Sequence, residues 1–306
     1  MKRIYDMLVI GGGPGGYTAA LYAARAGLSV AVLEKLSAGG QMALTDMVDN
    51  YPGFPEGIDG FSLGENMQLQ AQRFGAETVL TEVLELDLAP AEKAVRTSDG
   101  MFWGKTVVFA TGASPRKLGL SNEEFYTGRG LHYCAACDGM RYRGKTVAVI
   151  GGGDSAVADA LALARIAEKV IIVHRRDSLR ATKVYHKTLE NAENVEFRWN
   201  SNVTELLGEG RISGIKLQDV QTNEEAELSV DGVFVSIGRE PATALMKGQV
   251  ELDERGYIVA GENTATSLPG VYAVGDVRTK GLRQIVTAVA DGAYAAHEAE
   301  HYLSGQ

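Results

Sequence analysis

The chain has 306 residues, 45% of them hydrophobic and 23% charged, which is long enough for two domains with their own cores. Its net charge of -9 and pI near 5.2 argue against a general binder of nucleic acids or of anionic membranes. No run of about 18 apolar residues predicts a membrane span. The short apolar run near the start is interrupted by Asp6 and three glycines, so it fails as a signal peptide.

The first predicted unit begins with the apolar run Met7 to Ile10, which is typical of a buried parallel strand. A turn with the pattern GxGxxG follows at residues 11–16, and a helix of small residues is predicted from Tyr17 to Ala26. Gly27 then takes the position of a glycine that ends a helix.

A second strand is predicted at residues 29–33, and Glu34 ends it about 20 residues past the glycine turn. In this layout the turn and the helix N-terminus hold a pyrophosphate, and the acid accepts a hydrogen bond from a ribose hydroxyl. Strand, turn, helix, strand and terminal acid together predict a dinucleotide site. A structural glycine turn in some other α/β unit is the alternative.

Cys134 and Cys137 are the only two cysteines, and Asp138 follows them directly. Their bridge would close a very short loop and would constrain little of the unfolded chain, which argues against a structural staple. At positions i and i+3 on a first helical turn, their Cβ atoms come close enough for a disulfide. Asp138 can exchange a proton as thiols and thiolates interconvert. The pattern favours a cycling dithiol/disulfide pair in the reducing cytoplasm.

Other interpretations of the cysteines are weaker. Two buried core cysteines fit poorly beside glycine and aspartate. Zinc would need two further close ligands, and we predict no metal site. The spacing HxxxH occurs once, on the predicted terminal helix, among the histidines His132, His174, His186, His297 and His301.

The layout repeats in the middle of the chain. A strand is predicted at Thr146–Ile150, a turn with the pattern GxGxxA at 151–156, a helix near Ser155–Ile166 and a second strand at Lys169–Val173. The sequence therefore predicts a second dinucleotide fold.

The second fold ends differently from the first. His174, Arg175 and Arg176 stand where the first fold has its acid, and Arg180 follows one helical turn later. A carboxylate there would repel a phosphate, whereas guanidinium groups bind one, often with two hydrogen bonds. We therefore expect NADP(H) on the second fold, and a dinucleotide with a free 2′-hydroxyl on the first. A solvated basic turn is the alternative interpretation.

A third strand, Val271 to Val274, leads to Gly275 and Asp276, and a long helix is predicted from about Gln284 to Tyr302. These elements would complete the first domain, so the middle unit would be an insertion. The two connections, 110–119 and 237–245, both contain glycine and proline, as domain boundaries often do.

With these motifs in place, the chain resembles the family of bacterial low-molecular-weight thioredoxin reductases along its whole length. The stretches that carry the resemblance are GGGPGGYTAA (11–20), GGQM (39–42), VDNYPGFP (48–55), ATGA (110–113), GRGLHYCAACDG (128–139), GGGDSA (151–156), HRRDSLRA (174–181) and VGDVRTKGLRQIVTAVADGAYAA (274–296). Departures are Ala158 and Asp159, where the family often has two glutamates, and Ala242 in the second connection.

The resemblance implies two Rossmann-like domains in an α/β fold. It implies FAD in a discontinuous domain of residues 1–113 and 244–306, and NADPH in an inserted domain of residues 114–243 that carries the CxxC. It also implies a homodimer, and thioredoxin or a thioredoxin-like protein as partner. Electrons would pass from NADPH through FAD to the cysteine pair and then to the partner's disulfide. Rotation of the inserted domain would bring the nicotinamide and the pair to the flavin in turn.

The resemblance also assigns roles to residues. Cys137 would face the flavin, Cys134 would attack the partner's disulfide, and Asp138 would protonate the leaving thiolate. Cofactor contacts are expected in the first fold from Gly11, Gly13, Pro14, Gly15, Gly16, Glu34, Lys35, Gly40, Gln41, Asn50, Ala110, Thr111, Gly112, Gly275, Asp276, Arg283, Gln284, Ile285 and Ala288. In the second fold they are expected from Gly153, Asp154, Ser155, Ala156, His174, Arg175, Arg176, Arg180, Ile237 and Gly238. The helix that begins near Gln284 would point its positive end at the flavin.

Rival functions remain at this point. A flavoprotein that serves a peroxidase would usually carry an extra N-terminal thioredoxin-like domain, which we expect to be absent because the first strand starts near residue 5. Dithiol oxidases and ferredoxin-driven relatives need no basic nucleotide motif. A non-catalytic NADP(H) or redox sensor is the alternative from another class.

Overall fold

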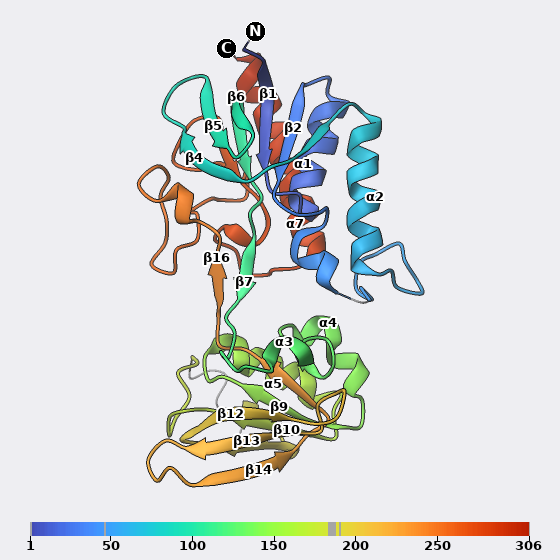
Figure 1. The fold of residues 1–306 in the computed structure, drawn as a ribbon, viewed down its shortest axis with the longest axis vertical. Coiled ribbons are helices and arrows are strands. Elements are labelled where there is room, and N and C mark those ends of the chain that lie inside the picture. Colours follow the sequence, from blue (N-terminus) through green and yellow to red (C-terminus); the bar gives the residue numbers. More distant parts are fainter. Residues whose placement is uncertain (1, 46, 183–187, 190, 306) are drawn as a thin grey trace. The chain divides into compact units, whose positions relative to one another are not determined.

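The computed structural model describes residues 2–45, 47–182, 188–189 and 191–305 (Figure 1). His186, weighed above as a metal ligand, lies outside the described residues. The chain divides into two compact units. The outer unit comprises residues 1–114 and 240–306, and the inserted unit comprises residues 115–239. Both contain parallel strands and helices, so the α/β fold class is confirmed.

The outer unit is built on one mixed sheet with the strand order β3-β2-β1-β6-β5-β4, in which β17 also pairs with β6. Its strands are β1 (Ile4–Ile10), β2 (Val30–Glu34), β3 (Glu77–Leu80), β4 (Val83–Asp87), β5 (Lys93–Thr97), β6 (Gly100–Phe109) and β17 (Val271–Ala273). Its helices are α1 (Pro14–Arg25), η1 (Gly40–Leu44), α2 (Gly60–Arg73), η3 (Ala244–Met246), η4 (Gly275–Val277) and α7 (Ile285–Ser304).

Strand β1 is buried on both faces, as its continuous apolar sequence predicts. Met7 and Val9 belong to the core that also contains α1 and α7 residues, whereas Leu8 and Ile10 belong to the core on the other face of the sheet. The helix after it begins at Pro14, three residues earlier than predicted. Proline is favoured at a first helical position, because its missing N–H has no partner there and its φ suits a helix.

Helix α1 ends at Arg25, one residue before the predicted end at Ala26, and Gly27 follows the C-cap residue Ala26 with a φ of +85°. Helices α1 and α7 then pack closely, and Figure 1 shows the terminal helix beside α1. A Cβ built on Gly292 of α7 would lie 2.3 Å from the carbonyl oxygen of Gly15. Only a residue without a side chain allows this approach, so the run of small residues in both helices is a packing requirement.

The inserted unit has a parallel sheet with the strand order β11-β10-β9-β15-β8, and a smaller antiparallel sheet β12-β13-β14. Its strands are β8 (Leu131–His132), β9 (Thr146–Ile150), β10 (Lys169–Val173), β11 (Val195–Arg198), β12 (Ser201–Leu207), β13 (Gly214–Asp219), β14 (Glu225–Ser229) and β15 (Gly232–Val235). Its helices are α3 (Glu123–Tyr126), α4 (Ala135–Asp138), η2 (Gly139–Tyr142) and α5 (Asp154–Ala164).

Strand β9 repeats the pattern of β1. Val147 and Val149 lie in the core beside α5, and Ala148 and Ile150 lie in the core beside the antiparallel sheet. The bounds of β9 and β10 agree with the predicted strands, because their apolar runs have abrupt polar ends.

The two connections between the units are the strands β7 (Ala113–Pro115) and β16 (Arg239–Pro241), which pair with each other. After β7, the carboxylate of Glu123 accepts backbone hydrogen bonds from Leu118, Gly119 and Leu120. Glu123 is 2% exposed and also accepts a hydrogen bond from the Tyr133 hydroxyl. One buried carboxylate therefore fixes the path by which the chain enters the inserted unit.

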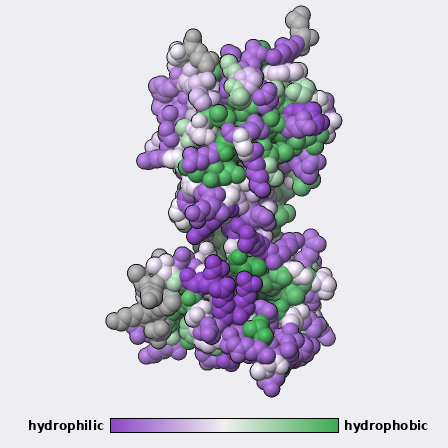
Figure 2. Space-filling model, turned by 90° about the vertical axis from the view of Figure 1, so that its left-hand side faces the viewer, coloured by the Kyte–Doolittle hydropathy of each residue, from purple (hydrophilic) through white to green (hydrophobic). Residues whose placement is uncertain are grey.

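Figure 2 shows mainly hydrophilic residues on this face of each unit, with hydrophobic areas among them. In the described part of the chain, no helix combines the length and the apolar character that a membrane crossing needs.

Candidate functional site

The acid at the end of β2 is held against the first glycine turn. The Glu34 carboxylate accepts hydrogen bonds from the backbone N–H groups of Gly12, at 2.6 Å, and of Leu36, at 2.9 Å. These bonds use backbone donors beside the turn, so the carboxylate is fixed at the position that the sequence pattern predicts for a ribose contact.

The glycines of the first turn are required by close backbone approach. A Cβ on Gly16 would lie 2.1 Å from the carbonyl oxygen of Gly11. A Cβ on Gly11, whose φ is +103°, would lie 2.5 Å from the carbonyl oxygen of Ala110. The structure thus brings the predicted segment that starts at Ala110 against the turn, as parallel pairing of β6 with β1 demands.

Space lies over both helix N-termini. A Cβ on Gly13 would meet its nearest neighbour, the Ala110 carbonyl oxygen, at 4.0 Å, and one on Gly153 would meet nothing within 4 Å. Each glycine is the N-cap of its helix, α1 and α5. Backbone N–H groups in the first turn of a helix, beside open space, fit a bound pyrophosphate, so the residues present fit a dinucleotide at each turn.

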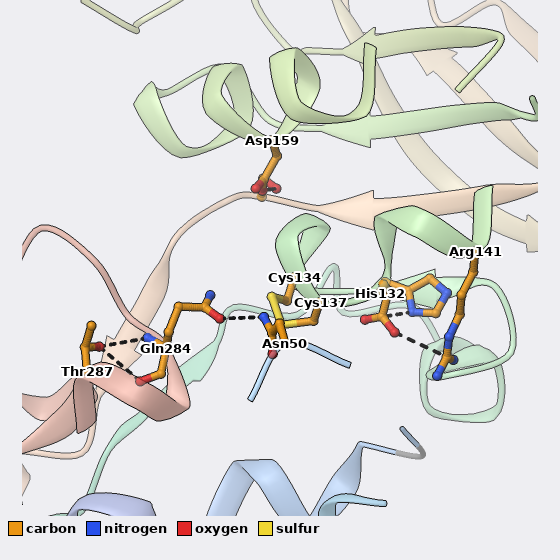
Figure 3. Close-up of a disulfide and its surroundings, with 10 residues drawn as sticks. Asn50, His132, Cys134, Cys137, Arg141, Asp159, Gln284 and Thr287 are labelled. Atoms are coloured by element: carbon orange, nitrogen blue, oxygen red, sulfur yellow. Dashed lines mark hydrogen bonds and ion pairs between the residues drawn. A yellow bond between two sulfur atoms is a disulfide. The ribbon is translucent and has the colours of Figure 1, made fainter. Parts of the chain in front are cut away.

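The side chains of Gln284, Thr287 and Asn50 form hydrogen bonds at the N-terminus of α7. Gln284 is the N-cap, and its backbone N–H donates to the Thr287 hydroxyl at 3.1 Å, which completes a capping box. The Asn50 amide donates to the Gln284 side-chain oxygen at 2.9 Å (Figure 3). The structure therefore joins Asn50 and Gln284, which are far apart in sequence, at one helix end.

Gly15 and Ala288 also meet in the structure. A Cβ on Gly15 would lie 3.0 Å from the Ala288 carbonyl oxygen and 3.0 Å from a methyl group of Val274. Gly40 packs beside the turn, since a Cβ on it would lie 3.6 Å from the Gly13 Cα. Predicted contacts from four segments of the outer unit therefore gather around the first glycine turn.

Asp291 was not predicted, although it organises the segment before α7. It is 6% exposed and accepts hydrogen bonds from the backbone N–H of Gly275, at 2.8 Å, and from both Arg278 and Lys280. Burial raises the pKa of Asp291, but the hydrogen bonds and charges of the two cations outweigh this and lower it. The sequence feature that could have indicated this role is a single carboxylate within a stretch of small residues on a packed helix.

In the second fold, His174 takes the place that Glu34 has in the first. Its ring lies over the glycine turn, because a Cβ on Gly152 would lie 2.5 Å from the ring atoms. Burial lowers the pKa of His174, and the charges of Arg176, Arg175 and Arg180 lower it further. A neutral ring is therefore favoured, and its buried Nε2 has no hydrogen-bond partner among the described residues.

The segment after His174 folds back onto the second turn. The backbone N–H of Arg180 donates to the Gly152 carbonyl at 2.7 Å. Thr182 donates from its backbone and its hydroxyl to Asp154 in the first turn of α5. Arg175, Arg176 and Arg180 are exposed. The basic side chains are thus carried beside the turn, where a phosphate on an adenosine ribose would lie.

The two cysteines form a disulfide with a Cα–Cα distance of 5.3 Å (Figure 3). Cys134 is the N-cap of the short helix α4, and its carbonyl accepts from the backbone N–H groups of Cys137 and Asp138. This helical turn is what brings the two sulfurs within bonding distance, as the spacing predicts. Both cysteines are half-buried, so neither is sealed in the core.

Asp138 has two charged or polar neighbours. His132 Nδ1 lies 3.3 Å from one carboxylate oxygen, and an Arg141 guanidinium nitrogen lies 3.7 Å from the other (Figure 3). The second ring nitrogen of His132 lies 2.7 Å from the Tyr142 hydroxyl. In the sequence, His132 was a candidate only for metal binding. Its position two residues before the cysteine pair was a usable signal.

Some predicted contacts have other partners in the structure. Lys35 forms an exposed ion pair with Glu82 at 2.7 Å, and the Thr111 hydroxyl donates to the Ala242 carbonyl at 2.9 Å. Asp159, one of the family departures, accepts a short hydrogen bond from Ser236. Burial raises the pKa of the Asp159 carboxyl group, although this hydrogen bond opposes the effect. Gly238, with a φ of +104°, accepts a hydrogen bond from the Arg116 backbone in the inserted unit.

Metal binding has no visible basis in the part of the chain that the structure describes. No group of three or more histidine, cysteine or carboxylate side chains gathers there. His297 and His301 stack edge to face on α7 with ring centroids 4.4 Å apart.

Comparison with known proteins places this geometry in context. A family model described as pyridine nucleotide-disulphide oxidoreductase matches residues 5–292. A thioredoxin reductase from Streptomyces clavuligerus is 44% identical over 99% of this chain and 95% of its own length. One from Treponema pallidum is 42% identical over 99% and 98%.

Solved structures agree with the sequence relatives. The thioredoxin reductase of Streptococcus pyogenes superposes with a TM-score of 0.94 at 42% identity, and covers 100% of both chains. That of Lactococcus lactis, described as the FR conformation, gives a TM-score of 0.69 at 40% identity, over 99% of this chain and 100% of its own.

Proposed function

The chain belongs to the pyridine nucleotide-disulphide oxidoreductase family, and from that premise we propose that it is an NADPH-dependent thioredoxin reductase. The observation that carries the proposal is the Cys134–Cys137 disulfide, followed directly by Asp138, in a unit whose dinucleotide fold ends in exposed arginines. A relative that used a different electron donor would have no need of that basic segment. The full-length relatives named above bear the same name as the proposed activity.

Family membership implies a flavin and a nicotinamide nucleotide, and we propose FAD in the domain of residues 1–113 and 244–306 and NADPH in that of residues 114–243. When bound, FAD would accept a hydride from NADPH and supply two electrons to a disulfide. The open space beside Gly13 and Gly153 supports one dinucleotide at each turn.

The residues of the first fold would bind and orient FAD. The fixed Glu34 carboxylate would accept from a ribose hydroxyl, and the N-terminus of α1 would hold the pyrophosphate. The N-terminus of α7, set by the Asn50–Gln284 hydrogen bond, would place a positive helix end near the ring system. Asp276 would accept from hydroxyl groups, since a carboxylate beside a phosphate is unfavourable.

The residues of the second fold would select the nucleotide. Arg175, Arg176 and Arg180 carry charge that a 2′-phosphate would pair with, and a neutral His174 would pack at the turn without adding a negative charge. A carboxylate at this position, as in the first fold, would disfavour the phosphate by like-charge repulsion.

The cysteine pair would connect the flavin with the partner. Reduction breaks the S–S bond and leaves two thiols, and the thiolate of Cys134 would then attack the partner's disulfide sulfur. Cys137 would close the bridge again and release the reduced partner. Asp138 would supply and accept the protons of these steps. The cysteine pair and the nucleotide site share one domain, yet each would have to reach the same flavin. That domain would therefore rotate between half-reactions about the β7 and β16 connections.

A cytoplasmic homodimer is the proposed form of the protein. The reducing cytosol suits a pair that must cycle, and the acidic net charge of -9 gives no support to a nucleic-acid partner.

NADPH-driven reduction of a disulfide dye, with and without added thioredoxin, tests the function. We expect a yellow protein whose absorbance is bleached by NADPH without oxygen, and turnover that rises when thioredoxin is added. A colourless protein, or a yellow one that NADPH cannot bleach, would contradict the proposal. Bleaching without transfer to thioredoxin would favour an oxidase or sensor.

A further inference from the structure

The imidazole of His132 is buried, polar and unused by the function proposed above. It is 5% exposed and lies at the end of the edge strand β8. Its ring stacks on Phe234 with centroids 5.3 Å apart, which fixes the ring plane. One ring nitrogen faces the Asp138 carboxylate at 3.3 Å, and the other lies 2.7 Å from the Tyr142 hydroxyl. Three groups able to exchange protons therefore form a continuous row.

The two partners of His132, Asp138 and Tyr142, assign the tautomer of this histidine. Burial raises the pKa of Tyr142, although the nearby Arg211 opposes this, so the phenol stays protonated. The Asp138 carboxylate can only accept a hydrogen bond, so the His132 Nδ1 that faces it carries the ring proton. Nε2 of the neutral ring is then an acceptor, and the Tyr142 phenol donates to it.

Among the described side-chain contacts of Asp138, one can replace a proton that Asp138 has given to a thiolate. Its other contact is Arg141, whose guanidinium does not give up a proton in proteins. His132 can release a proton at Nδ1 while it accepts another at Nε2. Of the two side chains that the described contacts place at this carboxylate, only the imidazole can therefore supply protons.

The outer end of the row reaches a cavity. His132 and Tyr142 line a space of about 380 Å³ together with Gly128, Arg129, Arg141, Lys145, Gly210 and Arg211. Arg129, Arg141 and Arg211 are exposed, and Lys145 lies over the Tyr142 ring at 5.8 Å from its centroid. The lining is polar, and a cavity of this size holds several water molecules. Tyr142 is 2% exposed but lines this space, and neither cysteine does, so water in the space lies beside Tyr142 and apart from the cysteine pair.

We propose that His132 is a positioning residue that holds the Asp138 carboxylate and supplies it with protons from the cavity through Tyr142. This rests on the proposed function, whose balance is NADPH + H⁺ + disulfide → NADP⁺ + two thiols. The two electrons and one hydrogen come from NADPH, and the second proton comes from solvent. The S–S bond breaks, Asp138 protonates the leaving thiolate, and His132, Tyr142 and a cavity water restore the proton in turn.

The test compares His132→Gln and Tyr142→Phe with the wild-type holoenzyme in NADPH-driven thioredoxin reduction between pH 6 and 9. We expect His132→Gln to lower kcat by about 10-fold, with a larger solvent isotope effect and an alkaline limb moved to lower pH. Tyr142→Phe should change the same readouts in the same direction but less. NADPH bleaching of the flavin and the KM for thioredoxin should stay within twofold of wild type.

Tyr133→Phe is the matched control, because its hydroxyl bonds to Glu123 and not to His132. It should keep the wild-type pH profile and solvent isotope effect. Free imidazole should partly restore a His132→Ala variant, as a relay predicts and a purely structural role does not. If His132→Gln misfolds, which loss of bleaching would report, the Tyr142→Phe profile decides.

A wild-type pH profile and isotope effect in both His132→Gln and Tyr142→Phe would overturn the relay. The same profiles measured with a small disulfide dye separate this result from a failure of the proposed function. A wild-type protein that reduces the dye but not thioredoxin would overturn the partner assignment alone.

Discussion

Glu34 and Gly12 are joined by a hydrogen bond of 2.6 Å from the turn's backbone N–H to the carboxylate, and His174 lies over Gly152 at the matching place of the second turn. The two folds therefore share one backbone layout and differ in the group that covers the turn. An anion covers the first, and a neutral ring followed by three arginines covers the second. This single difference is the physical basis for assigning different dinucleotides to the two domains.

Arg176→Ala should raise the KM for NADPH by about 10- to 100-fold, because a hydrogen bond to a charged group contributes about 1.5–3 kcal/mol. The KM for NADH, which lacks the 2′-phosphate, should change less than twofold. Steady-state kinetics with both nucleotides measure this, and Arg143→Ala, an exposed arginine of the same unit, is the control. Equal losses with NADPH and NADH would show that Arg176 does not read the phosphate.

Cys134→Ser and Cys137→Ser should each abolish thioredoxin reduction, because neither leaves a disulfide that can cycle. Bleaching of the flavin by NADPH should persist in both, since the glycine turns and their cofactor contacts lie outside the pair. Anaerobic stopped-flow absorbance measures the bleaching, and a coupled assay measures the turnover. Full turnover by either variant would refute the electron path proposed here.

Gly13→Ala and Gly16→Ala separate ligand space from packing space. The new methyl group at Gly13 has no neighbour closer than 4.0 Å, whereas at Gly16 it would lie 2.1 Å from the Gly11 carbonyl oxygen. We expect Gly13→Ala to fold but to lose most of its bound flavin, and Gly16→Ala to be expressed poorly or to unfold at a lower temperature. Flavin content and thermal unfolding measure the two effects. A Gly13→Ala protein with full flavin content would argue against a pyrophosphate at this turn.

The glycine turns, the buried strands and the cysteine pair could be predicted because each is encoded locally, by apolar runs, by glycine spacing and by the i, i+3 rule. The contacts of Arg180 with Gly152 and of Asn50 with Gln284 could not, since they join segments whose approach depends on the complete fold. The start of α1 at Pro14 differs from the predicted start at Tyr17, because residues 14–16 belong both to the glycine turn pattern and to the first helical turn, where proline is favoured.

Asp291→Asn should destabilise the outer unit by about 3–5 kcal/mol, because it leaves the two buried cations Arg278 and Lys280 without their carboxylate. The pKa of Asp291 is lowered in the folded protein from 3.8, so its contribution is complete above that value and is lost as pH falls through the folded pKa.

The stability gap between wild type and Asp291→Asn should therefore be widest near neutral pH and should narrow below about pH 4. Thermal unfolding from pH 3 to 7 measures it, with the exposed Glu262→Gln as control. A gap that is independent of pH would mean that the charge of Asp291 contributes nothing to stability.

The paired connections β7 and β16 also bear on how the chain is made. Residues 115–239 leave the ribosome as one uninterrupted segment, so the inserted unit can complete its sheet while synthesis continues. The outer unit must wait for its last strand and for α7, because α7 covers α1 and β17 pairs with β6. Until then the apolar face of α1 needs protection, and a nascent chain halted before residue 271 would be a natural client for a chaperone.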